Sequence, residues 1–180
     1  MIIVPKIRPG ASRTEPDGAV PAPAVLATTR LLVVRHGHAG DREKWEGPDE
    51  RRPLSKKGRR QAAGLLDLLK GYDVSRIVSS RYVRCLETVV ALACELRLGI
   101  EMHPAVAEGS SIVDLSALVA ELAGTTTVLC THGDVVWNLV VGLAHRNEDD
   151  LPMAKGSTWV VEGQGGLLAA ARYLPPPSKS

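Results

Sequence analysis

The sequence has 180 residues, 44% of them hydrophobic, and its 22 Lys and Arg against 20 Asp and Glu leave a formal net charge of +2. This length suits one domain with a substantial core, and the small net charge of mixed sign argues against binding to nucleic acid. No apolar run reaches the roughly 18 residues of a membrane span, and the apolar N-terminus is too short for a signal sequence, so we expect neither a membrane span nor secretion.

Residues 1–29 are rich in proline and polar groups and bury little, so the sequence predicts a flexible N-terminal tail there. The folded domain is expected to span residues 30–174, and the proline-rich residues 175–180 are expected to form a C-terminal tail. The cysteines lack paired spacing, which favours reduced thiols in a cytoplasmic protein. They are Cys85, Cys94 and Cys130.

Four consecutive branched apolar residues, 31–34, predict a strand that is buried on both faces. Arg35, His36 and Gly37 follow at once, where an α/β sheet presents its ligand-binding edge. The arginine supplies a planar cation for phosphate or carboxylate, and the histidine supplies a nitrogen that can act as a base or a nucleophile. Gly37 lets the backbone approach a ligand closely. We therefore expect the chemistry at this turn.

Helices and strands alternate along the rest of the chain. Ser55 is the predicted N-cap of a helix that runs to Lys70, and Ser79 and Ser80 are predicted to cap a helix over 81–96. Further helices are expected from 112 to about 123 and over 135–143. Strands are expected at 77–79, 100–103 and 126–131, with a closing hairpin of 157–161 and 167–173. This order predicts a three-layer α/β/α sandwich with a mainly parallel central sheet and an antiparallel edge strand.

His36 and His132 each follow an apolar strand and precede a glycine. A loop histidine without a role is the default interpretation of either one alone. Their parallel contexts and the neighbouring Arg35 favour a shared site at the carboxyl edge of the sheet. The sequence therefore predicts that the two imidazoles meet.

Arg84 is the candidate for a second phosphate-binding cation. Two guanidinium groups can hold the oxygens of a phosphoryl group while a histidine attacks in line. The alternative is a solvated helix arginine that pairs with Glu87 or Asp73. Arg81 competes for the same role, and the motif spacing given next selects Arg84.

Four motifs, in this order, resemble those of the histidine phosphatase superfamily, which is also called phosphoglycerate-mutase-like. They are Arg35-His36-Gly37, then Arg52-Pro53-Leu54 with Gly58 and Gln61-Ala62, then Ser80-x-x-x-Arg84-x-x-x-Thr88, and Thr131-His132-Gly133. The resemblance implies a phosphoglycerate-mutase-like fold and a phosphatase whose nucleophile is His36, through a phosphohistidine intermediate. It implies that Arg35 and Arg84 bind the phosphoryl group and that His132 stabilises the transition state.

The resemblance also places a general acid on Glu108, in the loop after the third strand, with an exposed loop glutamate as the alternative. Arg42 stands where many members of the family have an asparagine. The predicted substrate-binding residues are Arg35, Gly37, His38, Arg42, Ser80, Arg84 and Gly133.

His36 and His38 form a His-x-His pair, a spacing that can bind a metal ion. A metal site needs further ligands, and Arg35 at the same turn would repel a cation. We therefore expect no metal and no cofactor.

The segment between Thr88 and Thr131 is short, so the chain resembles the minimal SixA-type phosphohistidine phosphatases and the histidine-phosphatase domain of some Nudix proteins. An open site favours a phosphorylated protein as substrate. Small phosphorylated substrates are the alternative, and Trp45 could stack on a nucleotide base. A mutase is disfavoured because it must exclude water. From other classes, a non-catalytic phosphate-binding module and a metal hydrolase remain as alternatives.

Overall fold

A six-stranded sheet forms the centre of the computed structural model, which describes residues 27–145, 147 and 151–177. The strands lie in the order β3-β2-β4-β1-β5-β6. Neighbours from β3 to β1 are parallel, and the β5–β6 hairpin joins β1 in antiparallel orientation. The mainly parallel sheet is confirmed, with two antiparallel strands at its edge. The strands are β1 (Thr28–Arg35), β2 (Arg76–Ser79), β3 (Ile100–Met102), β4 (Thr126–Thr131), β5 (Thr158–Gln164) and β6 (Leu167–Leu174).

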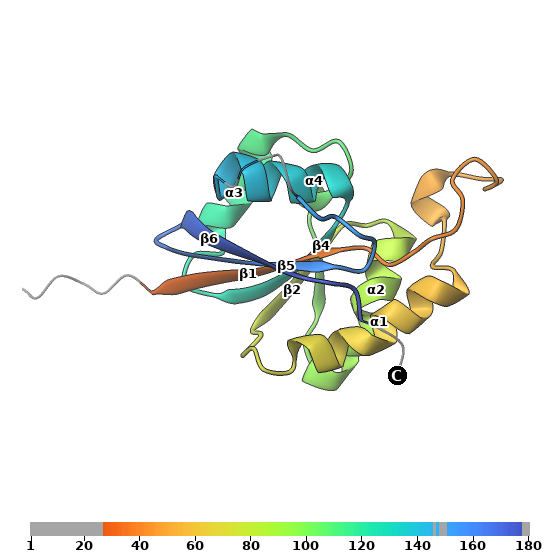
Figure 1. Cartoon of the computed structure of the whole chain (residues 1–180), viewed down its shortest axis with the longest axis horizontal. Coiled ribbons are helices and arrows are strands. Elements are labelled where there is room, and N and C mark those ends of the chain that lie inside the picture. The colour runs from red at the N-terminus through yellow and green to blue at the C-terminus, as the bar shows by residue number, and fades with distance from the viewer. Residues whose placement is uncertain (1–26, 146, 148–150, 178–180) are drawn as a thin grey trace, which may run out of the picture.

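Helices cover both faces of this sheet, which confirms the three-layer sandwich (Figure 1). On one side lie α1 (Lys56–Leu69) and α2 (Val83–Leu96), and on the other α3 (Ile112–Glu121) and α4 (Gly133–Trp137), which continues as the π-helical η3 (Asn138–Leu143). Alternate residues of β1 enter the two cores: Leu31 and Val33 pack with α3 and α4, and Leu32 and Val34 with α1 and α2. The unbroken apolar run of β1 follows from this double burial.

The start of α1 fixes the turn that follows β1. The Ser55 hydroxyl accepts a hydrogen bond from the Gly58 N–H at 3.2 Å, which confirms the predicted N-cap. A Cβ on Gly58 would lie only 2.1 Å from the carbonyl oxygen of His38, and a Cβ on Gly37 would lie 3.1 Å from the carbonyl oxygen of Gly58. These glycines therefore let helix and turn touch backbone to backbone.

The start of α2 differs from the expectation. Its N-cap residue is Tyr82, which makes no side-chain capping bond, so the capping role predicted for Ser79 and Ser80 is wrong. The Ser80 hydroxyl lies 2.9 Å from Nε2 of His132 and accepts only a longer bond, 3.4 Å, from the N–H of Tyr82. Because β2 ends beside β4, Ser80 reaches the histidine that follows β4.

The two ends of the domain are also packed into the fold. β1 begins at Thr28, before the expected domain start at residue 30, and residues 1–26 of the predicted tail lie outside the described residues. At the other end Pro177 contacts α1, where a Cβ on Gly64 would lie 2.5 Å from its side chain.

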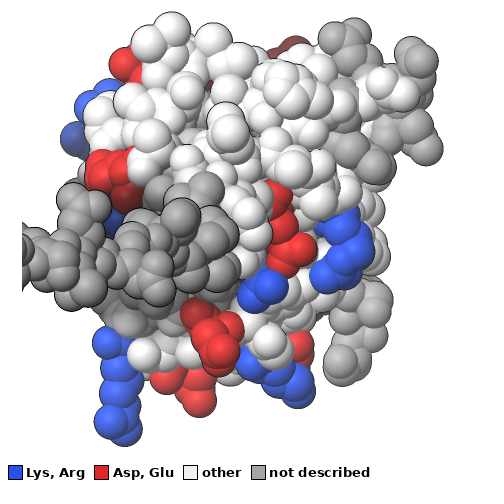
Figure 2. Space-filling model, turned by 90° about the vertical axis from the view of Figure 1, so that its left-hand side faces the viewer, with Lys and Arg blue, Asp and Glu red and all other residues white. Residues whose placement is uncertain are grey.

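Acidic and basic side chains are interspersed where the parallel strands begin (Figure 2). Within the described residues, no helix combines the length and apolarity needed to cross a membrane.

Candidate active site

The two motif histidines meet at the carboxyl edge of the sheet. β1 and β4 are parallel neighbours with Arg35 opposite Thr131, so His36 and His132 leave the sheet side by side. Their ring centroids are 5.3 Å apart, and the two residues are 5% and 2% exposed. The structure therefore brings together the pair that the sequence predicts.

His36 presents an unprotonated nitrogen to the site. Its Nδ1 lies 2.8 Å from the carbonyl oxygen of Gly37, which can only accept, so Nδ1 carries the hydrogen and Nε2 the lone pair. Nε of Arg84 donates to this Nε2 at 3.2 Å. Burial, together with the charges of Arg84, His132 and Arg35, outweighs the Gly37 hydrogen bond and lowers the pKa of His36 to about 3. The imidazole is therefore neutral at physiological pH.

Arg84 lies at the centre of the cluster and is only 1% exposed. Its Nη2 is 3.0 Å from Oδ2 of Asp49 and 3.0 Å from Oε2 of Glu108, and its Nη1 donates to the Asp49 carbonyl oxygen at 2.8 Å. The alternative of a solvated helix arginine paired with Glu87 or Asp73 is therefore wrong. The Glu87 carboxylate instead accepts from the N–H of Leu54 at 2.7 Å.

His132 is held by one ring nitrogen and faces the cluster with the other. Nε2 lies 2.9 Å from Oγ of Ser80. Nδ1 lies 3.4 Å from Nη2 of Arg84 and 4.0 Å from Oε2 of Glu108. A phosphoryl group beside His36 would therefore meet Nδ1 of His132.

Arg35 carries an unsatisfied donor at the same edge. Its Nη1 donates to the carbonyl oxygen of Met153, whereas its buried Nε has no hydrogen-bond partner within the described part of the chain. Burial lowers the pKa of Arg35, and the charge of Asp134 offsets part of this effect. Gly133 makes room for the guanidinium, since a Cβ there would lie 3.3 Å from Cζ of Arg35. An unsatisfied, buried cationic donor is suited to an anion.

The rim of the site contains two further charged residues, Asp49 and Arg52, that the sequence does not mark as site residues. Asp49, in the short helix η1 (Asp49–Arg51), accepts from Nε of Arg52 at 2.8 Å and lies 3.3 Å from Nη2 of Arg42. Burial raises the pKa of Asp49, but the Arg52 hydrogen bond and the charges of Arg84, Arg52 and Arg42 outweigh it and lower the pKa. Nη1 of Arg42 also donates to Glu108 at 3.0 Å. The only signal for Arg52 is its place in the Arg-Pro-Leu motif.

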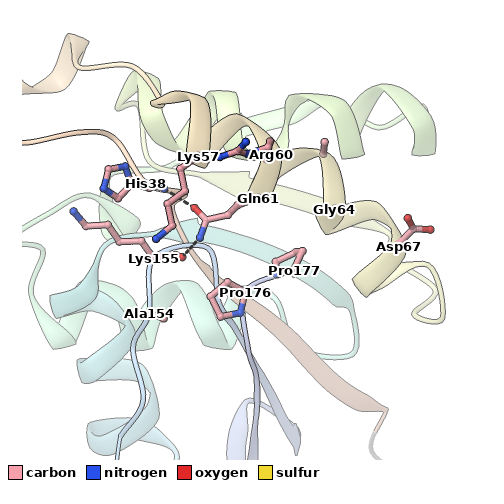
Figure 3. Close-up of a pocket in the computed structure, with 11 residues that line it drawn as sticks. His38, Lys57, Arg60, Gln61, Gly64, Asp67, Ala154, Lys155, Pro176 and Pro177 are labelled. Atoms are coloured by element: carbon pink, nitrogen blue, oxygen red, sulfur yellow. Dashed lines mark hydrogen bonds between the residues drawn. The ribbon is translucent and has the colours of Figure 1, made fainter. Parts of the chain in front are cut away.

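His38 lies beside the cluster. Its Nδ1 is 2.7 Å from Oγ of Ser55, and its ring lines a neighbouring cavity of about 1060 Å³ with Lys57 and Lys155 (Figure 3). The role of His38 in substrate binding stays a prediction, since this cavity is not lined by His36, Arg84 or His132.

The sandwich fold gathers two buried histidines and a buried arginine at one sheet edge, a set of side chains that is suited to phosphoryl transfer through a histidine. Residues 31–111 match the family model of the histidine phosphatase superfamily (branch 1), and this segment holds the first three of the four motifs named above.

Known proteins of similar sequence or structure are also phosphatases by name. The chain is 36% identical over 160 residues to the 8-oxo-(d)GTP phosphatase of Mycolicibacterium smegmatis, across 84% of this chain and 50% of that protein, so it spans about half the length of this relative. Among solved structures it resembles the protein histidine phosphatase SixA in complex with tungstate, with 22% identity and a TM-score of 0.64 over 81% of this chain and 94% of that one. It also resembles a mycobacterial glucosyl-3-phosphoglycerate phosphatase in complex with VO3, with 20% identity and a TM-score of 0.65 over 83% and 100%. These two structures establish the phosphoglycerate-mutase-like fold.

Proposed function

We propose that this chain is a phosphatase that transfers a phosphoryl group from its substrate to Nε2 of His36 and then to water. The observation that carries the proposal is the buried, unprotonated Nε2 of His36, 3.2 Å from the donor Nε of Arg84. A neutral imidazole nitrogen is a nucleophile, and the adjacent guanidinium compensates the charge of the phosphoryl oxygens. The unsatisfied Nε of Arg35 supplies a further donor, and Nδ1 of His132 lies beside the same space, 3.4 Å from Nη2 of Arg84.

Each step can be assigned to atoms of the site. In the first, a bond forms between Nε2 of His36 and phosphorus, the bond from phosphorus to the substrate oxygen breaks, and Glu108 protonates the leaving oxygen. In the second, water attacks phosphorus, the N–P bond breaks, and the water proton passes to the Glu108 carboxylate. Arg84 lies 3.0 Å from Glu108 and also contacts His36, so nucleophile and acid share one cation.

Labelling with ³²P tests the covalent step. We expect the wild-type chain to hydrolyse para-nitrophenyl phosphate and to yield an acid-labile, base-stable phosphoprotein after rapid quenching, and His36→Asn to do neither. His145→Asn, at an exposed histidine whose φ of 53° asparagine tolerates, is the matched control and should behave like wild type. Turnover by His36→Asn would refute the proposal, and binding of phosphate without turnover by wild type would favour the non-catalytic module.

Inhibitors separate the histidine mechanism from a metal hydrolase. Vanadate, which mimics a five-coordinate phosphoryl group, should inhibit the wild-type chain, whereas EDTA should leave its activity unchanged. Loss of activity with EDTA and recovery with a divalent cation would favour the metal hydrolase.

For the substrate, we infer a small phosphorylated molecule of the nucleotide class. The 36% identity to an 8-oxo-(d)GTP phosphatase supports this class. A protein phosphohistidine, which the short segment between Thr88 and Thr131 favours, is the second candidate. A panel of nucleoside phosphates, sugar phosphates and a phosphohistidine-bearing carrier protein, compared by kcat/KM, tests the choice. The highest kcat/KM for the phosphohistidine protein would reject the nucleotide class.

A further inference from the structure

The cavity of about 1060 Å³ beside the catalytic turn has a cationic lining. Its walls come from α1, the segment before β5 and residues 176–177 (Figure 3). Its only carboxylate within the described residues, Asp67, is paired with Lys70 at 3.1 Å, whereas none of the three lining cations has an ion pair in this part of the chain. These cations are Lys57, Arg60 and Lys155. The cavity is therefore positive and suited to an anion.

Hydrogen bonds connect the walls of the cavity to the turn that contains His36. Lys155 precedes Gly156, whose N–H donates to the carbonyl oxygen of His36 at 3.1 Å. From the opposite wall, Oε1 of Gln61 accepts from the N–H of His38 at 2.8 Å, and its Nε2 donates to the carbonyl oxygen of Lys155 at 2.6 Å (Figure 3). These bonds fix the backbone of Lys155 and Gly156 against the backbone of His36 and His38.

Lys155 is a half-buried cation among other cations. Burial and the charges of Arg35, Arg52 and Arg84 lower its pKa. Such an ammonium group is destabilised until a negative charge arrives, and it therefore favours an anionic ligand over an empty cavity. Lys57 extends into the same space from α1 (Figure 3).

We propose that Lys57 and Lys155 bind a second phosphate of the substrate while the terminal phosphate lies at His36. This inference rests on the proposed function and narrows it to small molecules that carry at least two linked phosphates, such as a nucleoside diphosphate. Nε2 of His36 bonds to the terminal phosphorus, the phosphoanhydride P–O bond breaks, and the remaining phosphate leaves as part of a nucleoside monophosphate. Water then releases inorganic phosphate from His36.

A ratio of rates on one enzyme preparation tests the proposal without depending on how much of the protein is folded. We measure kcat/KM for guanosine diphosphate divided by kcat/KM for para-nitrophenyl phosphate. The double variant K57Q/K155Q should lower this ratio at least tenfold, and K155R should keep it within threefold of wild type. The matched control is K56Q, which removes the same charge from the neighbouring residue of α1, outside the cavity lining, and should keep the ratio within twofold.

Binding of inorganic pyrophosphate, measured by calorimetry against inorganic phosphate, gives a readout that needs no turnover. Wild type should bind pyrophosphate at least tenfold more tightly than phosphate, and K57Q/K155Q should lose this preference. If the rate ratio of the double variant stays within threefold of wild type while para-nitrophenyl phosphate is still hydrolysed, the second subsite is refuted and the proposed function stands. If wild type hydrolyses neither substrate yet shows the lysine-dependent preference for pyrophosphate, the subsite stands and the proposed function fails.

Discussion

Oγ of Ser80 lies 2.9 Å from Nε2 of His132, so a hydroxyl at the end of β2 determines which ring nitrogen of His132 faces Arg84. Sγ of Cys85 lies 3.6 Å from the same Nε2. In the proposed reaction Ser80 acts through His132, so we infer that it is a positioning residue.

Ser80→Ala is expected to lower kcat for para-nitrophenyl phosphate about tenfold with a small change in KM, because it removes the bond that orients His132. The control is Ser75→Ala, a serine whose hydroxyl donates only to the Thr126 carbonyl far from the site. Ser80→Thr keeps a hydroxyl and should recover part of the lost activity. A wild-type kcat in Ser80→Ala would show that packing alone orients His132.

Acid should destabilise the wild-type fold through His36. An unfolded histidine binds a proton below a pKa of about 6.5, whereas burial lowers the pKa of folded His36 to about 3. Between these values the unfolded state holds the extra proton, so the free energy of unfolding falls by about 1.4 kcal/mol per pH unit as the pH decreases. From pH 7 to pH 5 the loss due to His36 should be about 2 kcal/mol.

Urea unfolding at pH 7, 6 and 5 measures this effect. His36→Asn should lose about 2 kcal/mol less than wild type over the range, whereas the exposed control His145→Asn should follow wild type. Parallel curves for wild type and His36→Asn would contradict the burial of a neutral imidazole.

The loss of kcat/KM caused by Glu108→Gln should depend on the leaving group of the substrate. An alkyl phosphate leaves as a strongly basic alkoxide that needs a proton, so its kcat/KM should fall about 100-fold, whereas para-nitrophenyl phosphate should lose less than tenfold. Glu46→Gln, in the exposed loop after β1, is the control. Equal losses for both substrates would indicate that Glu108 serves only to pair with Arg84 and Arg42.

Gly58→Ala should destabilise the protein by about 2–4 kcal/mol, because its Cβ would lie 2.1 Å from the carbonyl oxygen of His38. Helix propensity alone would give the opposite sign, since alanine is the better helix former by about 1 kcal/mol. Gly99→Ala, where a Cβ meets nothing within 4 Å, should be close to neutral. Thermal unfolding followed by circular dichroism distinguishes the two results, and an unchanged melting temperature in Gly58→Ala would contradict the close contact.

The sequence predicts the meeting of His36, His132 and Arg84 because each follows from a short-range pattern. Branched apolar runs define β1 and β4, and the ends of neighbouring parallel strands meet at one edge. Arg84 is selected over Arg81 by the serine-arginine-threonine motif of the superfamily that the sequence resembles. For β1 and β4, burial on both faces of the sheet produces an apolar run from which the strand can be predicted.

The rim of the site is not predictable in the same way. Asp49 lies in a charged loop whose conformation depends on ion pairs with Arg52, Arg42 and Arg84, and no periodic pattern records such pairs. The interpretation of Ser80 as a cap fails for a related reason: a local capping bond competes with a tertiary partner, His132, that is distant in sequence.

The order of the sheet has a consequence for the newly made chain. Among the described strands, β1 is the first to leave the ribosome, yet both of its neighbours, β4 and β5, are synthesised after most of the described residues. The N–H of Gly156, which leads into β5, secures the carbonyl groups of Arg35 and His36. A nascent polypeptide therefore holds His36, the proposed nucleophile, in place only once the segment that leads into β5 has emerged, and translation products that end before it should be catalytically silent.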